Sequence, residues 1–210
     1  MPSDITVVVT TIRPRIQAGL LARALASVGR QTLQPDTVVI SEDTAREGAA
    51  VTRQRGTARV TTSLVAYLDD DDEFGSEHLA RCHQLLVDTG ADLVYPWFDV
   101  AGGGDPFPMI FGREFDPDKY GINQIPVTFL ARTAAIRGAG GWTEGWDPAL
   151  AENPGTDEYG NRAGEDYMLT CRMVAAGARI VHLPERTWTW HHDSGNTSGL
   201  PSRVPWGAGT

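Results

Sequence analysis

The chain has 210 residues, enough for one substantial hydrophobic core, and no linker rich in Pro, Gly or Ser divides it into balanced halves. Apolar residues make up 41% of the chain and charged residues 21%, which argues against a disordered or fibrous protein. The formal net charge of −9 offers no general attraction to nucleic acids or anionic membranes, and no segment has the length of a membrane span.

The amino terminus, Met1-Pro2-Ser3-Asp4, lacks the charged and apolar regions of a signal peptide. Cys82 and Cys171 both fall at apolar-face positions of predicted helices, which favours buried thiols over a disulfide or a metal site. We therefore expect a soluble, cytoplasmic protein in a reducing compartment.

Short apolar runs alternate with helical patterns through the first half of the chain. Strands are predicted at residues 5–10, 37–40, 65–68 and 92–98, and helices at 20–28, 49–59 and 79–90. This alternation predicts an α/β fold with a mostly parallel central sheet, right-handed crossovers and flanking helices.

The second half is less regular. Residues 101–108 are rich in Gly and Pro and are predicted to form a loop. Gly102-Gly103-Gly104 lacks the strand-to-helix context of a phosphate loop, so no ligand is assigned to it. Residues 138–164 form a long polar stretch that we expect to be functional or mobile. The remaining patterns predict a strand at 127–131, a helix ending after 136, a helix at 165–176 and a strand at 179–183.

Four consecutive aspartates, Asp69 to Asp72, directly follow the apolar run 65–68. Like charges this close repel one another and resist burial, so we expect a cation or another positive group nearby. Carboxylates at the carboxyl end of an α/β strand suit Mg²⁺ or Mn²⁺ that carries substrate phosphates. The alternative is a solvated acidic turn that helps to cap the helix beginning near Ser76.

Three polar clusters follow predicted strands, at residues 10–13, 41–44 and 69–72. The carboxyl ends of parallel strands meet at one edge of a sheet, where α/β proteins bind ligands. Three clusters on one rim favour a ligand site over three unrelated turns.

The order and spacing of these signals resemble the inverting family 2 glycosyltransferases, which have a GT-A fold. The matching segments run from residue 5 to about residue 198 and comprise residues 5–11, 24–28, 31–32, 41–43, 53–56 and 67–72, Gly140-Gly141-Trp142 and Gly164-Glu165-Asp166-Tyr167. The resemblance implies a Rossmann-like GT-A domain at 1–192, with a nucleotide-binding half at about 1–100 and an acceptor-side half at about 101–192. A Gly/Pro-rich tail follows at 193–210.

On the donor side, the resemblance assigns roles to residues at all three strand ends and on the helix at 49–59. A carboxylate is a suitable acceptor for the imide N–H of uracil, and a guanidinium fork suits phosphate oxygens. A surface helix cation is the alternative interpretation of Arg53. The implied donor contacts are Thr10, Thr11 and Arg13 around the nucleotide, Asp43 at the base, Arg53 near the base and diphosphate, and Asp69 and Asp70 at the ribose.

The resemblance also implies a divalent cation, Mn²⁺ or Mg²⁺, held by Asp71 and by a histidine after the last predicted strand. His192 is the preferred histidine, and His191 is the neighbouring alternative. Such an ion would act as a Lewis acid on the departing diphosphate.

Asp166 resembles the catalytic base at the start of the family's late helix, which would take the proton of the acceptor hydroxyl. Glu165, Gly141 and Trp142 are assigned to the acceptor and sugar side. For Glu165 the alternative is stabilisation of the first helical turn, and for Trp142 it is packing.

The expected function is therefore metal-dependent, inverting transfer of one sugar from a nucleoside diphosphate sugar, with UDP-sugar preferred, to an acceptor hydroxyl. A nucleotidyltransferase is one alternative, although residues 10–15 lack the glycine-rich basic loop usual after its first strand. A non-catalytic module that binds sugar nucleotides or glycans is another. The acceptor stays open, and the acidic net charge disfavours nucleic acid.

Overall fold

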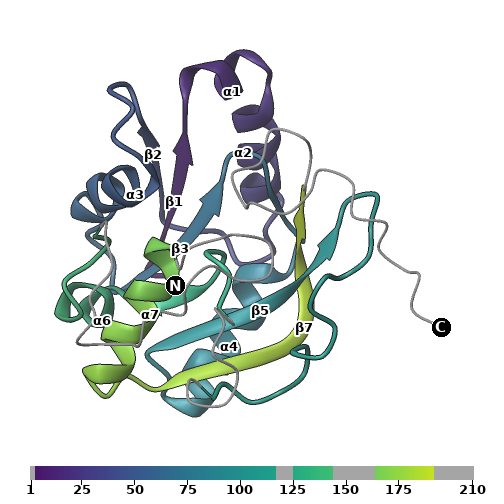
Figure 1. The fold of residues 1–210 in the computed structure, drawn as a ribbon. Helices are drawn as coiled ribbons and strands as arrows, with labels where there is room; N and C mark the ends of the chain where they lie inside the picture. Colours follow the sequence, from purple (N-terminus) through teal and green to yellow (C-terminus); the bar gives the residue numbers. More distant parts are fainter. Residues whose placement is uncertain (1–2, 117–124, 144–163, 192–210) are drawn as a thin grey trace.

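The computed structural model describes residues 3–116, 125–143 and 164–191 (Figure 1). They form a seven-stranded sheet in the order β2-β1-β3-β6-β5-β7-β4. The strands are β1 (Ile5–Thr11), β2 (Thr37–Glu42), β3 (Leu64–Asp69), β4 (Glu73–Phe74), β5 (Leu93–Val100), β6 (Leu130–Arg132) and β7 (Ile180–Trp190). The helices are α1 (Arg13–Gln17), α2 (Leu20–Gly29), α3 (Ala49–Ala58), α4 (His78–Thr89), α6 (Thr133–Gly138) and α7 (Glu165–Ala175).

The strands β2, β1 and β3 form a parallel unit, which lies in the upper part of Figure 1. Strand β1 is rich in β-branched residues, and most of β1 and β3 is fully buried, as expected of strands that are covered on both faces. The register pairs Thr10 with Ser41 on one side and with Asp69 on the other. This confirms that the three polar clusters meet at one rim.

The rest of the sheet is mixed. Strand β6 runs antiparallel between β3 and β5, β7 runs parallel to β5, and β4 pairs antiparallel with β7. The α/β fold with flanking helices is confirmed, and the parallel order holds in the part that carries the polar rim.

Strand β7 is much longer than the predicted strand at 179–183. Tyr95 pairs with His182, but the next partners are Trp97 and Arg186, so β7 contains two more residues than β5 between these pairs. Pro184 lies within this irregularity, where its missing N–H costs no ladder hydrogen bond. The strand then continues to Trp190, beside the aspartate run.

The helices α2 and α4 confirm the predicted apolar stripes, and α4 ends at Gly90, whose φ is 67°. Helix α3 has no such stripe and approaches the sheet through small residues. A Cβ on Gly56 would lie 2.4 Å from Cγ1 of Val8, so glycine permits this close contact with β1. The hydroxyls of Thr57 and Tyr67 lie 2.8 Å apart and join α3 to β3.

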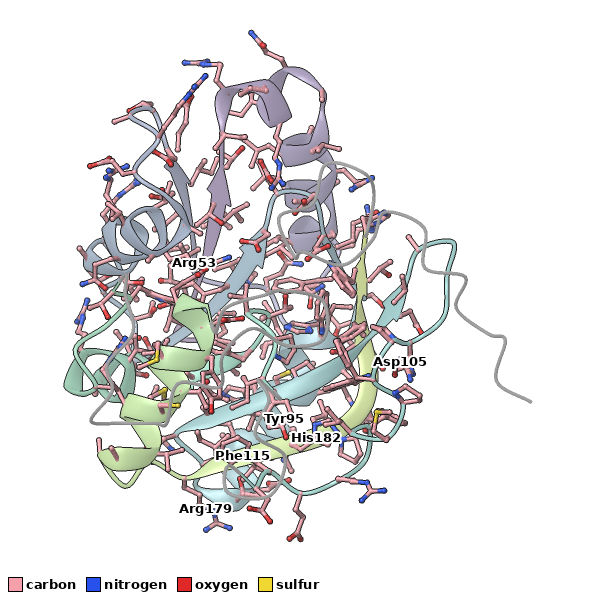
Figure 2. The ribbon with its side chains drawn as sticks, in the orientation of Figure 1. Arg53, Tyr95, Asp105, Phe115, Arg179 and His182 are labelled. Atoms are coloured by element: carbon pink, nitrogen blue, oxygen red, sulfur yellow. The ribbon has the colours of Figure 1, made fainter. Side chains whose placement is uncertain are left out.

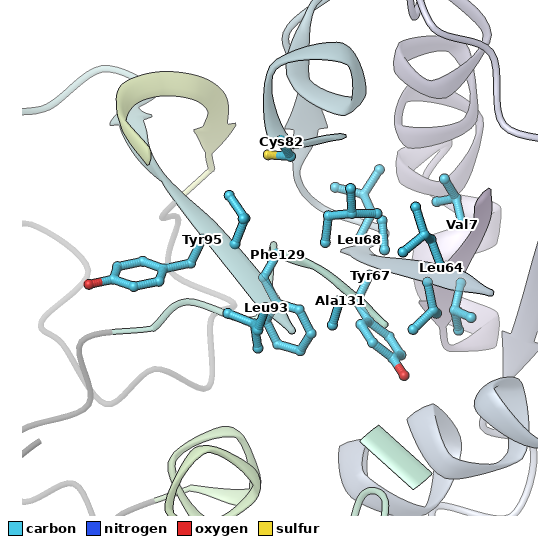
Figure 3. Packing of buried hydrophobic residues seen from close by; sticks show 14 of the residues in the cluster. Val7, Leu64, Tyr67, Leu68, Cys82, Leu93, Tyr95, Phe129 and Ala131 are labelled. Atoms are coloured by element: carbon cyan, nitrogen blue, oxygen red, sulfur yellow. The ribbon is translucent and has the colours of Figure 1, made fainter. Parts of the chain in front are cut away.

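The core lies between the sheet and its helices, and Figure 3 shows its aromatic part around Tyr67 and Phe129. Cys82 is buried as predicted, but Cys171 is only half-buried. It lies on the opposite flank of α7 from Leu169 and Met173, which face the core. None of the helices in the described ranges combines the length and the apolar character that a bilayer-crossing segment requires.

Candidate functional site

The carboxyl ends of β1 and β3 are joined by side-chain hydrogen bonds. The Thr10 hydroxyl donates to Oδ1 of Asp69 over 2.7 Å, and the Thr11 hydroxyl donates to Oδ2 of Asp70. Both threonines therefore orient carboxylates of the aspartate run, and the hydroxyl of Thr11 is buried against Asp70.

The alternation of a strand stops at Asp69, where β3 ends, so the following carboxylates do not alternate between two faces. Arg15 of α1 binds two of them: Nη1 lies 2.9 Å from Oδ1 of Asp70, and Nη2 lies 3.0 Å from Oδ2 of Asp71. Arg53 of α3 binds Asp69. The positive groups expected near the run are thus at least in part arginines of this chain.

The pKa values of the run differ because the arginines compensate its members unequally. Burial raises the pKa of Asp69, but the charge of Arg53 and the hydrogen bonds from Thr10 and Arg53 together outweigh it and lower the pKa overall. Burial raises the pKa of Asp70 despite its bonds to Thr11 and Arg15. For Asp71, burial and the charge of Asp69 raise the pKa to about 6.

The last strand meets the other end of the run. The backbone N–H of His191 donates to Oδ1 of Asp72 over 2.9 Å. In the ring of His191, Nε2 lies 3.0 Å from Oε1 of Glu73. Arg23 of α2 donates to the carbonyl oxygen of Asp71. The histidine pair therefore begins beside the aspartates, although His192 itself lies outside the described residues.

Arg53 is 5% exposed, which excludes the surface-cation alternative. Its Nη2 lies 2.9 Å from both Oδ1 and Oδ2 of Asp69, and Nη1 binds Oε1 of Glu165. Burial alone would lower its pKa, but the carboxylates raise it, so Arg53 is permanently charged. Its guanidinium is occupied by carboxylates, rather than open to a phosphate as the resemblance implied.

Asp166 lies at the first turn of α7, next to the carboxylate bound by Arg53. Its Oδ1 accepts the N–H of Tyr167 over 2.8 Å, and the residue is half-buried. Burial and the neighbouring charge of Glu165 raise the pKa of Asp166 to about 6. A Cβ on Gly164 would lie 2.9 Å from Oδ1 of Asp166, so the absence of a side chain there leaves room for the carboxylate.

The Gly140-Gly141-Trp142 segment serves packing in this structure. Trp142 is 2% exposed, and its ring packs edge-on against Tyr67 and parallel to Phe129. The structure therefore favours the packing alternative for Trp142 over an open ring face for a sugar.

Gly141 is required because its backbone lies very close to the side chain of Gln54. Its φ is 70°, and a Cβ there would lie 2.3 Å from Oε1 of Gln54, the atom that accepts the N–H of Trp142 over 2.9 Å. The segment is thereby fixed to α3 next to Arg53.

Asp43 and Arg13 flank the rim. Asp43 accepts the N–H groups of Glu47 and Gly48 at 2.9 Å each, and these bonds from the loop lower its pKa. Arg13 is 67% exposed in its side chain and pairs with Glu42 at 3.1 Å. Both side chains lie beside the ends of β1 and β2, so they remain candidates for nucleotide contacts.

Among the described residues, no three His, Cys, Asp or Glu side chains converge in a preformed metal site. Asp71 nevertheless suits a cation, since its carboxylate is 15% exposed, and burial and the charge of Asp69 raise its pKa although Arg15 binds it. Sites that bind Mg²⁺ or Mn²⁺ with substrate phosphates use one or two carboxylates, and Asp71 fits that role.

Arg15 and Arg23 are the residues of this site that sequence reasoning missed. The available signal was the position of Arg13-Pro14-Arg15 immediately after the first strand, at the same rim as an acidic run.

Comparison with known sequences identifies a matching family and a relative. The profile of Glycosyl transferase family 2 matches residues 43–137, which include Asp43, Arg53 and the aspartate run. The succinoglycan biosynthesis protein ExoW of Rhizobium meliloti (strain 1021) is 32% identical over 123 residues, which cover 46% of this chain and 38% of ExoW.

Solved structures share the fold. S. aureus TarS 1–349 in complex with UDP-GlcNAc matches with a TM-score of 0.67 at 15% identity, covering 93% of this chain and 60% of that chain. The mannosyltransferase PcManGT from Pyrobaculum calidifontis, in complex with GDP-Man and Mn²⁺, matches with a TM-score of 0.60 at 12% identity, covering 92% and 58%. This chain thus spans less than two thirds of each relative.

Proposed function

We propose that this chain transfers one sugar from a nucleoside diphosphate sugar to an acceptor hydroxyl. Its residues 43–137 belong to glycosyl transferase family 2, and its sheet has the GT-A fold. The proposed reaction inverts the anomeric carbon, depends on a divalent cation and uses a UDP-sugar.

One relationship carries this proposal. Arg53, which is labelled in Figure 2, binds Asp69 at the carboxyl end of β3 and Glu165 at the start of α7, so one side chain spans the two elements. This supports the proposal that the aspartate run and Asp166, which are far apart in the sequence, belong to one site. That is the arrangement a transferase needs, since the donor phosphates and the base must face the same anomeric carbon.

The donor side is the rim formed by Thr10, Arg13, Asp43 and the aspartate run. In this proposal Asp43 uses its remaining lone pairs for the imide N–H of uracil, which supports a UDP-sugar donor. TarS has been solved with UDP-GlcNAc and PcManGT with GDP-Man, so similar folds accept different bases.

The cation would be held by Asp71 and by His192, together with oxygens of the donor diphosphate. When bound, it would neutralise the negative charge that develops on the departing diphosphate. Asp71 is the described residue that fits this role.

Asp166 acts as the general base of the proposed reaction. It accepts the proton of the acceptor hydroxyl as that oxygen bonds to the anomeric carbon, while the bond from this carbon to the diphosphate oxygen breaks. A single displacement of this kind inverts the configuration. A pKa of about 6 keeps Asp166 ionised at neutral pH and makes it more basic than an ordinary aspartate.

The test screens a panel of nucleotide sugars for release of nucleoside diphosphate, with Mn²⁺ and with EDTA. Calorimetry with UDP in the presence of Mn²⁺ compares the wild type with Asp71→Ala. We expect metal-dependent release from one donor, and weaker UDP binding by the variant. Binding of UDP without any release would identify a binding module. Conversion of the nucleotide sugar and added pyrophosphate into nucleoside triphosphate and sugar 1-phosphate would identify a nucleotidyltransferase.

A further inference from the structure

The side chain of Arg53 is fixed by contacts from several elements of the protein. Its guanidinium contacts Asp69 and Glu165, and Cζ lies 5.1 Å from the ring centroid of Trp142. Its Nε is buried and has no hydrogen-bond partner within the described part of the chain. The side chain is thus held on three sides by the protein.

The surroundings of Arg53 leave it little freedom to move. The close approach of Gly56 to Val8 and the hydroxyl pair of Thr57 and Tyr67 anchor the helix that carries it. On the other side, Gln54 holds the backbone of Trp142, which places the indole ring over the guanidinium. These contacts fix the side chain of Arg53 between the sheet and α7.

We propose that Arg53 is a positioning residue, which holds Glu165 at the carboxyl end of β3 and thereby fixes the first turn of α7 so that Asp166 faces the donor. This inference rests on the proposed function. It replaces a phosphate contact for Arg53 and an acceptor contact for Glu165 by one ion-paired bridge. Asp166 alone remains the group that exchanges a proton with substrate.

The bridge also sets the charge around Asp166. Glu165, on the same helix, raises the pKa of Asp166, and Arg53 from α3 lowers it. Asp69 faces Arg53 from β3 and compensates part of its charge, and Tyr167 donates its backbone N–H. Replacing Glu165 should therefore lower the pKa of Asp166, since its negative charge is removed while Arg53 is kept.

The variants are Glu165→Gln, which keeps the shape, and Arg53→Lys, which keeps the charge but cannot bind both carboxylates. Arg55→Lys is the matched control, because Arg55 is on the same helix and points to the exposed loop at Glu47. Measured with the active donor, both test variants should lose about 100-fold in kcat with donor KM within about twofold, as expected for a misplaced base. In the pH profile of kcat, the fall in rate toward acidic pH should move to lower pH in Glu165→Gln only. The control Arg55→Lys should match the wild type.

A second measurement makes the inference independent of turnover. The carboxyl carbon of Asp166, labelled with ¹³C and assigned by comparison with Asp166→Asn, is titrated by NMR in each variant. We expect a lower midpoint in Glu165→Gln than in the wild type. If the wild type turned over no donor but this shift occurred, the influence of the Glu165 charge on Asp166 would stand and the proposed function would fail.

Two results would overturn the inference. One is a donor KM that rises in Arg53→Lys while kcat is unchanged, which would make Arg53 a phosphate ligand. The other is an Asp166 midpoint and a kcat in Glu165→Gln that equal those of the wild type, which would show that Glu165 neither places nor charges the base.

Discussion

Nη2 of Arg15 lies 3.0 Å from Oδ2 of Asp71, the carboxylate that we propose as the cation ligand. The same guanidinium binds Asp70 through Nη1. In the absence of a cation, Arg15 therefore supplies part of the positive charge that the aspartate run needs. It both supports the run and shares the carboxylate that a cation would bind.

Replacing Arg15 by Gln should lower the free energy of unfolding in EDTA by about 1–2 kcal/mol, because two carboxylates lose a charged partner that is 27% exposed. Addition of Mn²⁺ should then raise Tm by more in the variant than in the wild type, since the carboxylate of Asp71 is no longer paired with Arg15. Urea denaturation and thermal melts measure both effects. Arg13→Gln is the control on the same helix, and its exposed pair with Glu42 should contribute less than about 1 kcal/mol. An equal loss in both variants would contradict this role of Arg15.

Replacing Gly164 by Ala should reduce activity with little loss of stability. The new Cβ would lie 2.9 Å from Oδ1 of Asp166, and a carboxylate at the end of a side chain can rotate away without moving the backbone. We expect kcat to fall about tenfold or more, while the free energy of unfolding changes by less than about 1 kcal/mol. Gly138→Ala, at a glycine with open space around it, should retain kcat. Full activity of Gly164→Ala would contradict the observed position of Asp166.

The rate should fall as the pH drops through about 6, because Asp166 must be ionised to accept a proton and its pKa is raised to about 6. Asp71 has a raised pKa of about 6 as well, but a bound cation competes with its proton. The pH profile of kcat is therefore measured at saturating donor and Mn²⁺. Under these conditions the loss of rate that protonation of Asp166 causes should persist. A kcat that stays constant down to pH 4.5, well below that pKa, would exclude Asp166 as the base.

Replacing Gly56 by Ala should destabilise the protein by about 1–3 kcal/mol, since the added methyl would meet Cγ1 of Val8 at 2.4 Å and push α3 from the sheet. Because α3 carries Arg53, kcat should fall too. Gly29→Ala is the helical control with open space around it, and it should be neutral or stabilising by up to about 1 kcal/mol. Equal stability of Gly56→Ala and the wild type by urea denaturation would show that α3 packs differently.

Much of the fold can be predicted from the sequence, for definite physical reasons. Buried parallel strands such as β1 and β3 consist of continuous apolar runs, and α2 and α4 show a single apolar stripe. The rim follows from the topology, because parallel strands place their carboxyl ends together. Helix α1 has no buried residue, and therefore no periodic pattern by which it could be found.

The contacts of the site depend on residues that are distant in sequence. Arg15 and Asp70 are 55 positions apart, and Arg53 and Glu165 are 112 apart, so no local pattern indicates these pairs. The sequence pattern also does not indicate that Arg53 is buried, because α3 packs through Gly56 and threonines rather than through large apolar side chains. Likewise, nothing in the order of residues distinguishes a Trp142 that packs from one that contacts a sugar.

The role of Asp166 as the base is tested by comparing the wild type with Asp166→Asn at saturating Mn²⁺ and an active nucleotide sugar, with the initial rate of nucleoside diphosphate release as the measurement. UDP affinity, measured by calorimetry, is the internal control. We expect the variant to bind UDP as the wild type does and to turn over about 10² to 10⁴ times more slowly. A variant that binds UDP normally and releases the nucleotide at the wild-type rate would contradict that role of Asp166.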